Sequence, residues 1–219
     1  MYSGTDAFPG FFQRGVAQVL WTDTVHRFSL TLGLNTLCPE EGLWRVSLLD
    51  QHGQPVYGTC FSILPGPRLF IGVIQGGRAS AGHDPRAAIR AATRHFAGLR
   101  PQFLLLQVLR ELAMAWDIPA LTGVADAHQV SRRRRRHLPI QVRFSYDAYF
   151  AEAAAQPGRD GNWALAAKAG DRAMHTLPSR KRALYRRREQ LLQDLANQIR
   201  AATTSRAQAS PGAPASSAG

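Results

Sequence analysis

The segment RLFIGVIQGG at residues 68–77 decides much of the fold, because it combines a strand pattern with a pair of glycines. Its apolar residues are mostly β-branched or aromatic, which is typical of a buried strand. We expect Gln75, Gly76 and Gly77 to end this strand in a tight turn, since glycine takes positive φ without strain. A helix is expected to begin a few residues later.

The segment RPQFLLLQVLRELAMAWDI at residues 100–118 predicts a long helix that is buried on most sides. Pro101 is favoured in the first turn of a helix, and the apolar residues that follow recur at helical spacing. Pro119 ends the pattern, and LTGVAD at 121–126 is short and apolar enough for a second central strand.

The residues before position 68 carry strand and turn patterns. LWRVSLLD at 43–50 and VYGTCFSIL at 56–64 are joined by a Gly- and Pro-containing turn, which predicts a hairpin. Together with 68–77 they are expected to form an antiparallel meander. Residues 11–34 carry apolar residues at mixed, partly helical spacing. Other predicted elements are a helix at 84–97, a helix at 146–155, an edge strand at 162–168 and a helix at 179–202.

This element order predicts a single α+β domain over residues 11–202. Its sheet is expected to be mixed but mostly antiparallel, flanked by helices, with a long C-terminal helix. We expect residues 1–10 to be loose. Residues 203–219, which are rich in Ser, Ala, Pro and Gly, are expected to form a disordered tail.

The chain of 219 residues has a formal net charge of +12, which favours anionic partners such as acidic lipid, a phosphorylated small molecule or nucleic acid. Alternatively, the high positive charge reflects genome base composition, because nearly all the basic residues are Arg. No apolar run reaches the ~20 residues of a membrane span, and no basic segment precedes the first apolar residues as in a signal peptide. The two cysteines, Cys38 and Cys60, are expected to be thiols in a reducing cytoplasm.

The last predicted helix places two cations on its apolar face. At 100° per residue, Lys181 and Arg188 fall on the face of Leu184, Leu191 and Leu195. An unpaired charge near a core is costly, so these cations need a partner or a ligand. The structural alternative is that they snorkel or pair with acidic residues of the sheet.

Other candidate residues lie at strand and helix ends. Gln75, Gly76 and Gly77 offer backbone amides for a phosphate, or are simply a turn. Arg100, at the start of the helix that contains Pro101, offers a competing anion site. His128 follows the second central strand, where a general base or an ordinary surface histidine would both fit. Tyr146 and Asp147 supply a hydroxyl and a carboxylate, or begin a helix.

Arg132–Arg136 is the densest charge run. As a solvated loop it needs no function, and as a patch it would bind phosphate-rich surfaces in a salt-dependent way. No aromatic residues interleave with it, which argues against stacked single-strand recognition. The histidines and cysteines lack metal-ligand spacing, so no metal site is predicted.

Several segments together resemble the VirK/YbjX family of bacterial proteins over residues 16–202. These are EGLWRVSL (41–48), LFIGVIQGG (69–77), GLRPQFLLL (98–106), AHQV (127–130), YDAYF (146–150) and PSRKRALYRRR (178–188). The resemblance implies a domain of unknown activity associated with virulence, envelope stress and resistance to cationic antimicrobial peptides. Family members are usually longer at the N-terminus, with additional helices. The positions it marks are Gly72, Gln75, Gly76, Gly98, Arg100, Pro101, His128, Tyr146, Asp147, Lys181, Arg182, Tyr185 and Arg188.

The predicted element order is also similar to the GNAT acyltransferase fold, in which an acyl-CoA pyrophosphate binds amides at a helix start. Our first hypothesis is therefore a cytoplasmic acyltransferase-like enzyme that uses acyl-CoA or acyl carrier protein on an envelope precursor or lipid. His128, Tyr146 and Asp147 would be catalytic. The second hypothesis is a non-enzymatic factor, peripheral at the inner membrane, that binds acidic lipid through Arg-rich segments. Nucleic-acid binding ranks last. The residues expected to hold the anion are Gln75, Gly76, Gly77, Arg100, Lys181, Arg182 and Arg188.

Overall fold

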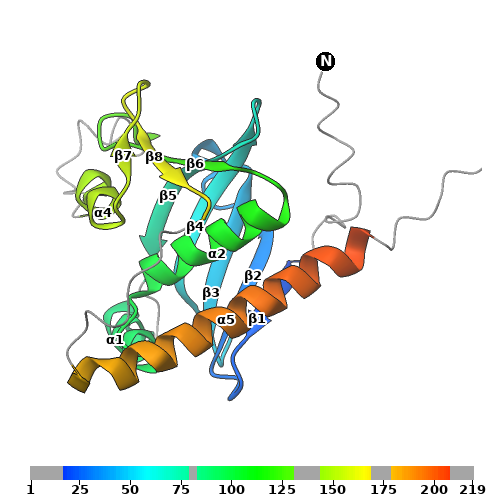
Figure 1. Cartoon of the computed structure of the whole chain (residues 1–219), viewed down its shortest axis with the longest axis vertical. Helices are drawn as coiled ribbons and strands as arrows, with labels where there is room; N and C mark the ends of the chain where they lie inside the picture. Colours follow the sequence, from blue (N-terminus) through cyan, green and yellow to red (C-terminus); the bar gives the residue numbers. More distant parts are fainter. Residues whose placement is uncertain (1–16, 79–82, 131–143, 169–178, 208–219) are drawn as a thin grey trace, which may run out of the picture.

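The computed structural model describes residues 17–78, 83–130, 144–168 and 179–207, and these form one α+β domain around an eight-stranded sheet (Figure 1). The strand order is β1-β2-β3-β4-β5-β6-β8-β7, and every neighbouring pair is antiparallel except the parallel pair β5–β6. The predicted fold class is therefore confirmed. The strands are β1 (Gln18–Thr22), β2 (Phe28–Leu34), β3 (Trp44–Asp50), β4 (Pro55–Leu64), β5 (Arg68–Gly76), β6 (Ala120–Gly123), β7 (Gln156–Pro157) and β8 (Trp163–Ala166).

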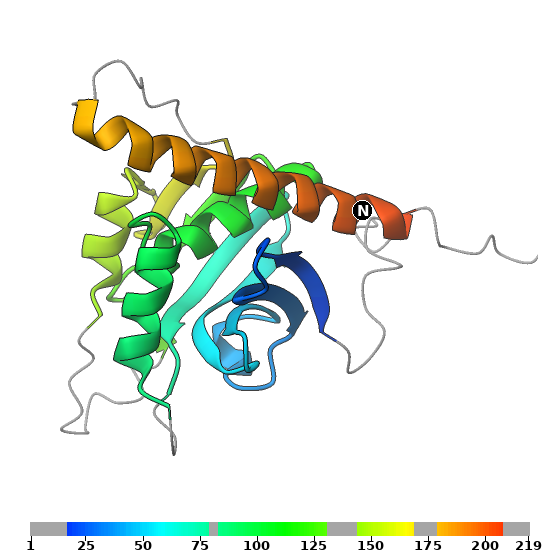
Figure 2. The same cartoon turned by 90° about the horizontal axis from the view of Figure 1, so that it is seen from below.

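The helices lie near their predicted positions, although α5 continues to Ala207, beyond its predicted end at 202 and into the segment that was expected to be disordered. In Figure 2, α1, α2 and α5 lie on one side of the curved sheet, and α5 runs across the molecule beside α2. Buried Leu195 and Ile199 attach α5 to the core, and Trp21 of β1 donates a hydrogen bond from Nε1 to Asp194 Oδ2 at 2.8 Å. The helices are η1 (Pro39–Glu41), α1 (Pro85–His95), α2 (Pro101–Ala115), α4 (Tyr146–Glu152) and α5 (Ser179–Ala207).

Residues 18–34 form a β-hairpin, which corrects the partly helical interpretation of this part of 11–34; residues 11–16 lie outside the described residues. β1 and β2 pair antiparallel and extend the predicted meander to five strands. Phe28, Leu30 and Leu32 of β2 are buried while the residues between them are half-buried. This alternation is the strand period, but Leu20 and Trp21 are buried next to each other where β1 is irregular, which blurred the pattern.

The strand β5 contains a bulge at Gly72. Cys60 pairs with Val73 and Phe61 with Ile71, so Gly72 is the extra residue. A Cβ atom on Gly72 would lie 1.9 Å from the carbonyl oxygen of Glu41, so only glycine fits. Pairing of β5 with β6 ends near the bulge, at Ile71 and Gly123, with one further bond from Val124 N to Ile71 O at 3.0 Å.

The predicted tight turn at Gly76 and Gly77 is wrong. β5 continues through Gly76, which pairs with Tyr57, and Gly77 N donates to Val56 O at 2.9 Å. Neither glycine has positive φ. Gly77 is needed because a Cβ there would lie 2.0 Å from Pro55 O. The predicted strand at 162–168 is confirmed as β8, although the edge of the sheet is β7.

Candidate anion-binding groove

A groove of about 1060 Å³ lies between α2, α5, the end of α4 and β8. Its walls combine apolar side chains with charged ones. Cations from three separate elements line it, together with three glutamates. The apolar lining residues include Leu99, Phe103, Leu106, Leu165 and Leu192, and the charged ones are Arg100, Arg110, Glu111, Glu152, Lys168, Arg188, Glu189 and Arg200.

Arg188 of α5 points at the turn between α1 and α2. Its Nη2 donates to the carbonyl oxygen of Ala97 at 2.8 Å, and its guanidinium carbon lies 4.9 Å from the ring centre of Tyr185. Ala97 and Gly98 have positive φ, 51° and 76°, where the chain leaves α1. Carbonyls at a helix end lack helical partners and attract cations. Arg188 therefore caps this turn, and its buried Nε has no hydrogen-bond partner among the described residues.

Arg100 lies at the start of α2, on the same groove. Its guanidinium binds the carboxylate of Glu152 on α4 and stacks over the ring of Phe103 at 4.8 Å. The side chains of Arg100 and Glu152 are about half exposed, 46% and 55%, so their pairing contributes little to folding stability. Arg100 is accordingly a cation that a competing anion can recruit at little cost.

Two charged residues of α2 sit deeper in the groove. Burial lowers the pKa of Arg110, and burial raises the pKa of Glu111 against the opposing effect of Arg200. The Arg200 Nη2 and Glu111 Oε2 atoms are 3.7 Å apart, too far for a hydrogen bond. Arg110 Nε and Glu111 Oε2 are buried without a hydrogen-bond partner in the part of the chain that the structure describes. Both atoms have almost no accessible surface, so a ligand in the groove would reach them only after a side-chain movement.

A second polar cluster lies where β6 ends and α4 begins. Asp126 accepts hydrogen bonds from Ser145 Oγ and Tyr146 N, both at 2.8 Å. Asp147 accepts from Trp163 Nε1 at 2.7 Å and from Asp126 N at 3.2 Å. These contacts fix α4 against β6 and β8. The Oδ1 atom of Asp147 thus has two structural hydrogen-bond donors. The catalytic role predicted for Asp147 stays a prediction.

The Tyr146 hydroxyl takes the place of a missing strand partner. It lies 3.4 Å from both the amide nitrogen and the carbonyl oxygen of Ile74, beyond the point where β5 and β6 stop pairing. Burial raises the pKa of Tyr146, so the phenol stays protonated at neutral pH. His128 is exposed and its Nδ1 lies 3.0 Å from Asn162 Oδ1 in the β7–β8 hairpin.

The structure thus divides the predicted site residues. Arg100 and Arg188 line one groove, while His128, Tyr146 and Asp147 gather at the end of β6. Gln75 and Gly76 end β5 and pair with Gly58 and Tyr57 of β4, and Gly77 continues along the same strand. Arg182 is exposed on α5. The side chain of Lys181 and the run Arg132–Arg136 lie outside the described residues.

Four charged residues of the groove were not predicted from the sequence: Arg110, Glu111, Lys168 and Arg200. A signal was present for the first two, because they are the charged pair inside the otherwise apolar pattern of 101–116. Charged residues within such a helix must find partners or face a hollow. Lys168 and Arg200 carried no comparable signal, since each is a single cation near the end of a predicted edge strand or amphipathic helix, where an exposed charge is ordinary.

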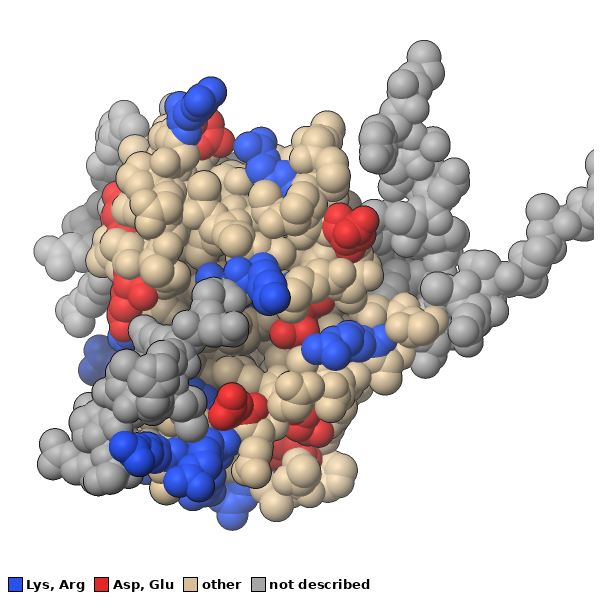
Figure 3. All heavy atoms as spheres, viewed as in Figure 1, with Lys and Arg blue, Asp and Glu red and all other residues tan. Residues whose placement is uncertain are grey.

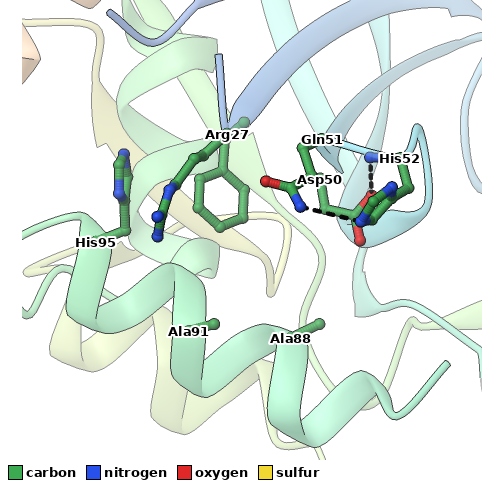
Figure 4. Close-up of a pocket in the computed structure, with 8 residues that line it drawn as sticks. Arg27, Asp50, Gln51, His52, Ala88, Ala91 and His95 are labelled. Carbon is green, nitrogen blue, oxygen red and sulfur yellow. Dashed lines mark hydrogen bonds between the residues drawn. The ribbon is translucent and has the colours of Figure 1, made fainter. Parts of the chain in front are cut away.

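A smaller cavity of about 220 Å³ lies beside α1. Figure 4 shows Arg27 and His95 side by side, with Ala91 of α1 nearby and the turn that carries Asp50 and His52 on the opposite side. His95 Nε2 lies 2.5 Å from Oδ2 of buried Asp23, whose Oδ1 accepts from the backbone amide of Arg27 at 2.6 Å. This pairing joins the β1–β2 turn to α1.

Residues 5–201 match the family described as protein of unknown function DUF535, and the chain belongs to that family. It is 24% identical over 177 residues to the uncharacterized protein YbjX of Escherichia coli K12, covering 79% of this chain and 53% of the relative. Two uncharacterized proteins of Haemophilus influenzae Rd are similar, at 26% identity over 181 residues and 29% over 178. These alignments cover 83% and 81% of this chain, and 60% and 58% of the relatives.

The chain therefore spans between about half and three fifths of the length of these curated relatives. No solved structure matches it. Among the described residues, no group of three or more His, Cys, Asp or Glu side chains could hold a metal ion. No helix in the ranges that the structure describes is long and apolar enough to cross a bilayer.

Proposed function

We propose that the groove binds an amphipathic anion, a molecule that joins a phosphate or carboxylate to an apolar chain. The observation that carries this proposal is that Arg188 of α5 and Arg100 at the start of α2, which are far apart in the sequence, line the same groove together with apolar side chains. Guanidinium groups suit phosphates and carboxylates because their planar donors form paired hydrogen bonds. The leucine and phenylalanine side chains along the same walls suit an acyl chain.

The binding test uses isothermal titration calorimetry with the full chain and three probes: coenzyme A, a long-chain acyl-CoA and the free fatty acid. We expect the acyl-CoA to bind most tightly, because it alone offers both an apolar chain and phosphates. Arg100→Ala and Arg110→Gln should each weaken it by about tenfold, the effect of losing roughly 1.4 kcal/mol. Arg187→Ala, on the exposed side of α5, is the matched control. Absence of binding by all three probes would end the proposal.

Acyl transfer is the enzymatic form of this proposal. It is supported by the element order of a meander, two helices, a strand parallel to β5, the helix α4 and the β7–β8 pair. This order is similar to the hairpin, third strand, helices, strand, helix and strand on which the likeness to the GNAT fold is based. β5 and β6 stop pairing beyond Ile71 and Gly123, and ligands of open α/β sheets bind beyond the carboxyl ends of parallel strands. His128 would then act as a base, with an envelope lipid or its precursor as acceptor. Because His128 lies at the end of β6 and does not line the groove, the acyl thioester would have to reach from the groove to that end of the sheet.

Acyl transfer is tested by following free coenzyme A release from acyl-CoA in the presence of a bacterial lipid extract. Wild type should release coenzyme A faster than His128→Ala. If coenzyme A is released at equal rates by wild type, by His128→Ala and in buffer alone, acyl transfer is excluded and only the binding proposal remains. The likeness to a family associated with virulence and envelope stress makes such a lipid the expected acceptor class.

Docking on acidic lipid is the non-enzymatic alternative. Arg182, Arg186 and Arg187 are exposed near the start of α5, and blue side chains gather at that end of the helix in Figure 3. Each such cation near an anionic surface contributes about 1 kcal/mol at low salt. We expect co-sedimentation with vesicles that contain phosphatidylglycerol, weakening as salt rises. Equal binding to neutral vesicles would rule this mode out. Nucleic-acid binding has only the net charge in its support.

A further inference from the structure

The two cysteines of the chain meet in space. Cys38 and Cys60 are 22 positions apart, yet their Sγ atoms lie 3.5 Å from each other, and both are free thiols. Cys60 is fully buried in β4, while Cys38 is half-buried in the loop that begins η1. A disulfide bond has an S–S length of about 2.05 Å. The two sulfur atoms are therefore already neighbours, and bond formation needs only a small local movement.

The loop that carries Cys38 is held in place by the buried side chain of Asn35. Its Nδ2 donates to Cys38 O at 2.6 Å and to Gly42 O at 2.7 Å, and its Oδ1 accepts from Cys38 N at 3.2 Å. Leu37 N also donates to Asn35 Oδ1 at 3.3 Å, so one side chain satisfies four backbone groups of the loop. The approach of Cys38 to Cys60 is a consequence of this clamp and of the β4 register.

A cation stands beside the thiol pair. Arg45 Nη1 lies 3.5 Å from Cys60 Sγ, and Arg45 Nε donates to Ser47 Oγ at 3.1 Å. Gly58 makes room for this guanidinium, since a Cβ there would lie 2.3 Å from Arg45 Nη2. Burial raises the pKa of Cys60 to about 12, and Arg45 opposes that rise. A neighbouring cation favours the thiolate, which is the form that attacks disulfides.

We propose that Cys38 and Cys60 form an intramolecular disulfide when the protein meets a disulfide oxidant such as oxidised glutathione. The half-buried Cys38 thiolate attacks one sulfur of the oxidant, forms a mixed disulfide and releases one glutathione thiolate. Because Cys60 is fully buried, the loop of Cys38 must open for Cys60 to lose its proton to water. The Cys60 thiolate then attacks Cys38 Sγ and releases the second glutathione thiolate. Two protein thiols lose two protons and two electrons, and the oxidant is reduced to two thiols.

The disulfide would join η1 to β4 next to the end of the parallel strand pair. Glu41 of η1 lies with its carbonyl oxygen against Gly72, and its Oε1 accepts a hydrogen bond from Gln129 Nε2 at 2.8 Å. Gln129 follows β6, in the loop that also carries His128. Oxidation therefore acts on the loop that packs against both the bulge of β5 and the segment after β6. This inference does not depend on what the groove binds.

The test uses the full chain, reduced and freed of reductant, then incubated with oxidised glutathione at mildly alkaline pH. After denaturation and alkylation, intact-mass spectrometry should show a monomer that has lost two hydrogens and takes up no alkylating agent. Peptide mapping should join the peptides of Cys38 and Cys60. The thermal midpoint should rise by several degrees, and dithiothreitol should reverse all three changes.

Two variants separate the steps. Cys60→Ser should stop at the mixed disulfide on Cys38, and Arg45→Gln should accumulate that mixed disulfide because it loses the cation beside Cys60. Gln54→Ala, at an exposed position of the β3–β4 turn, is the control that should behave as wild type. The proposal is overturned if both thiols of the folded wild type stay open to alkylation, if Cys38 keeps glutathione, or if the disulfide joins two chains.

Discussion

Arg188 and Ala97 lie 91 residues apart, and a hydrogen bond of 2.8 Å from Arg188 Nη2 to Ala97 O joins α5 to the turn after α1. The sequence places Arg188 on the apolar face of the last helix, where a cation needs a partner or a ligand, and this contact supplies one. The described partner of Arg188 is a backbone carbonyl at a helix end. The same side chain lines the groove together with Arg100.

We expect Arg188→Ala to lower the free energy of unfolding by about 1–2 kcal/mol, because it removes a charge-assisted hydrogen bond and the packing on Tyr185. Arg188→Lys should recover only part of this loss, since an ammonium cannot reproduce the planar fork. Urea denaturation measures both. Arg187→Ala should change stability by no more than about 0.5 kcal/mol. A wild-type urea midpoint for Arg188→Ala would contradict the structural role.

Gly123→Ala should destabilise the protein through a clash. A Cβ at Gly123 would lie 2.1 Å from Cζ of Phe150, which is fully buried and cannot easily move. Overpacking of this kind typically costs about 1–3 kcal/mol, seen as a lower urea midpoint. Gly33→Ala is the matched comparison, because its Cβ would meet Ala17 at an ordinary 3.4 Å. Similar urea midpoints for the two variants would show that Phe150 and α4 move aside without loss of stability.

Tyr146→Phe should cost about 1–2 kcal/mol, because removal of the hydroxyl leaves the amide and carbonyl of Ile74 without the partner they have in the structure. Thermal or urea unfolding measures the loss. Tyr185→Phe should keep its stacking with Arg188 and remain close to wild type. If both variants unfold like wild type, the hydroxyl does not replace the strand partner of β5.

Folding stability should fall at high pH. Burial raises the pKa of Tyr57 to about 12 and also raises the pKa of Tyr146 and Tyr149. A raised phenol pKa means that the folded state holds its proton more tightly than the unfolded state. The stabilisation is therefore complete below the unfolded value of about 10 and is lost as pH rises through the folded values. Phenolate absorbance should rise late and together with loss of circular dichroism. If all tyrosines titrate reversibly at about pH 10 while the protein stays folded, the predicted loss of stability at high pH is refuted.

Glu111→Gln should raise the urea midpoint at pH 7. Burial raises the pKa of Glu111, so the folded state favours its protonated form, and stability is lost as pH rises above the unfolded value of about 4.5 through the folded value. The neutral glutamine avoids that loss. The advantage over wild type should disappear near pH 4, where the carboxyl is protonated in both states. Glu189→Gln, on the exposed part of α5, serves as the control and should show no such pH-dependent gain.

Local patterns predicted most elements because they depend on neighbours in the chain. The periodicity of 101–116 and its leading proline are set within the helix, and α2 covers Pro101–Ala115 as expected. The glycines at 76 and 77 were misread because their reason lies elsewhere, in the close approach of Pro55 O to Gly77. The hairpin β1–β2 was missed because adjacent buried residues at an irregular pairing obscured the strand period.

By itself, the sequence determined the family, the α+β class, the order of most elements and the helix face on which Arg188 lies. Only the tertiary structure decided that Arg188 meets Ala97 and shares a groove with Arg100, and that Arg110 belongs to the same groove. It also decided that Cys38 meets Cys60. The physical reason is that periodicity is a property of adjacent residues, whereas these contacts join distant segments whose approach depends on strand register and helix packing.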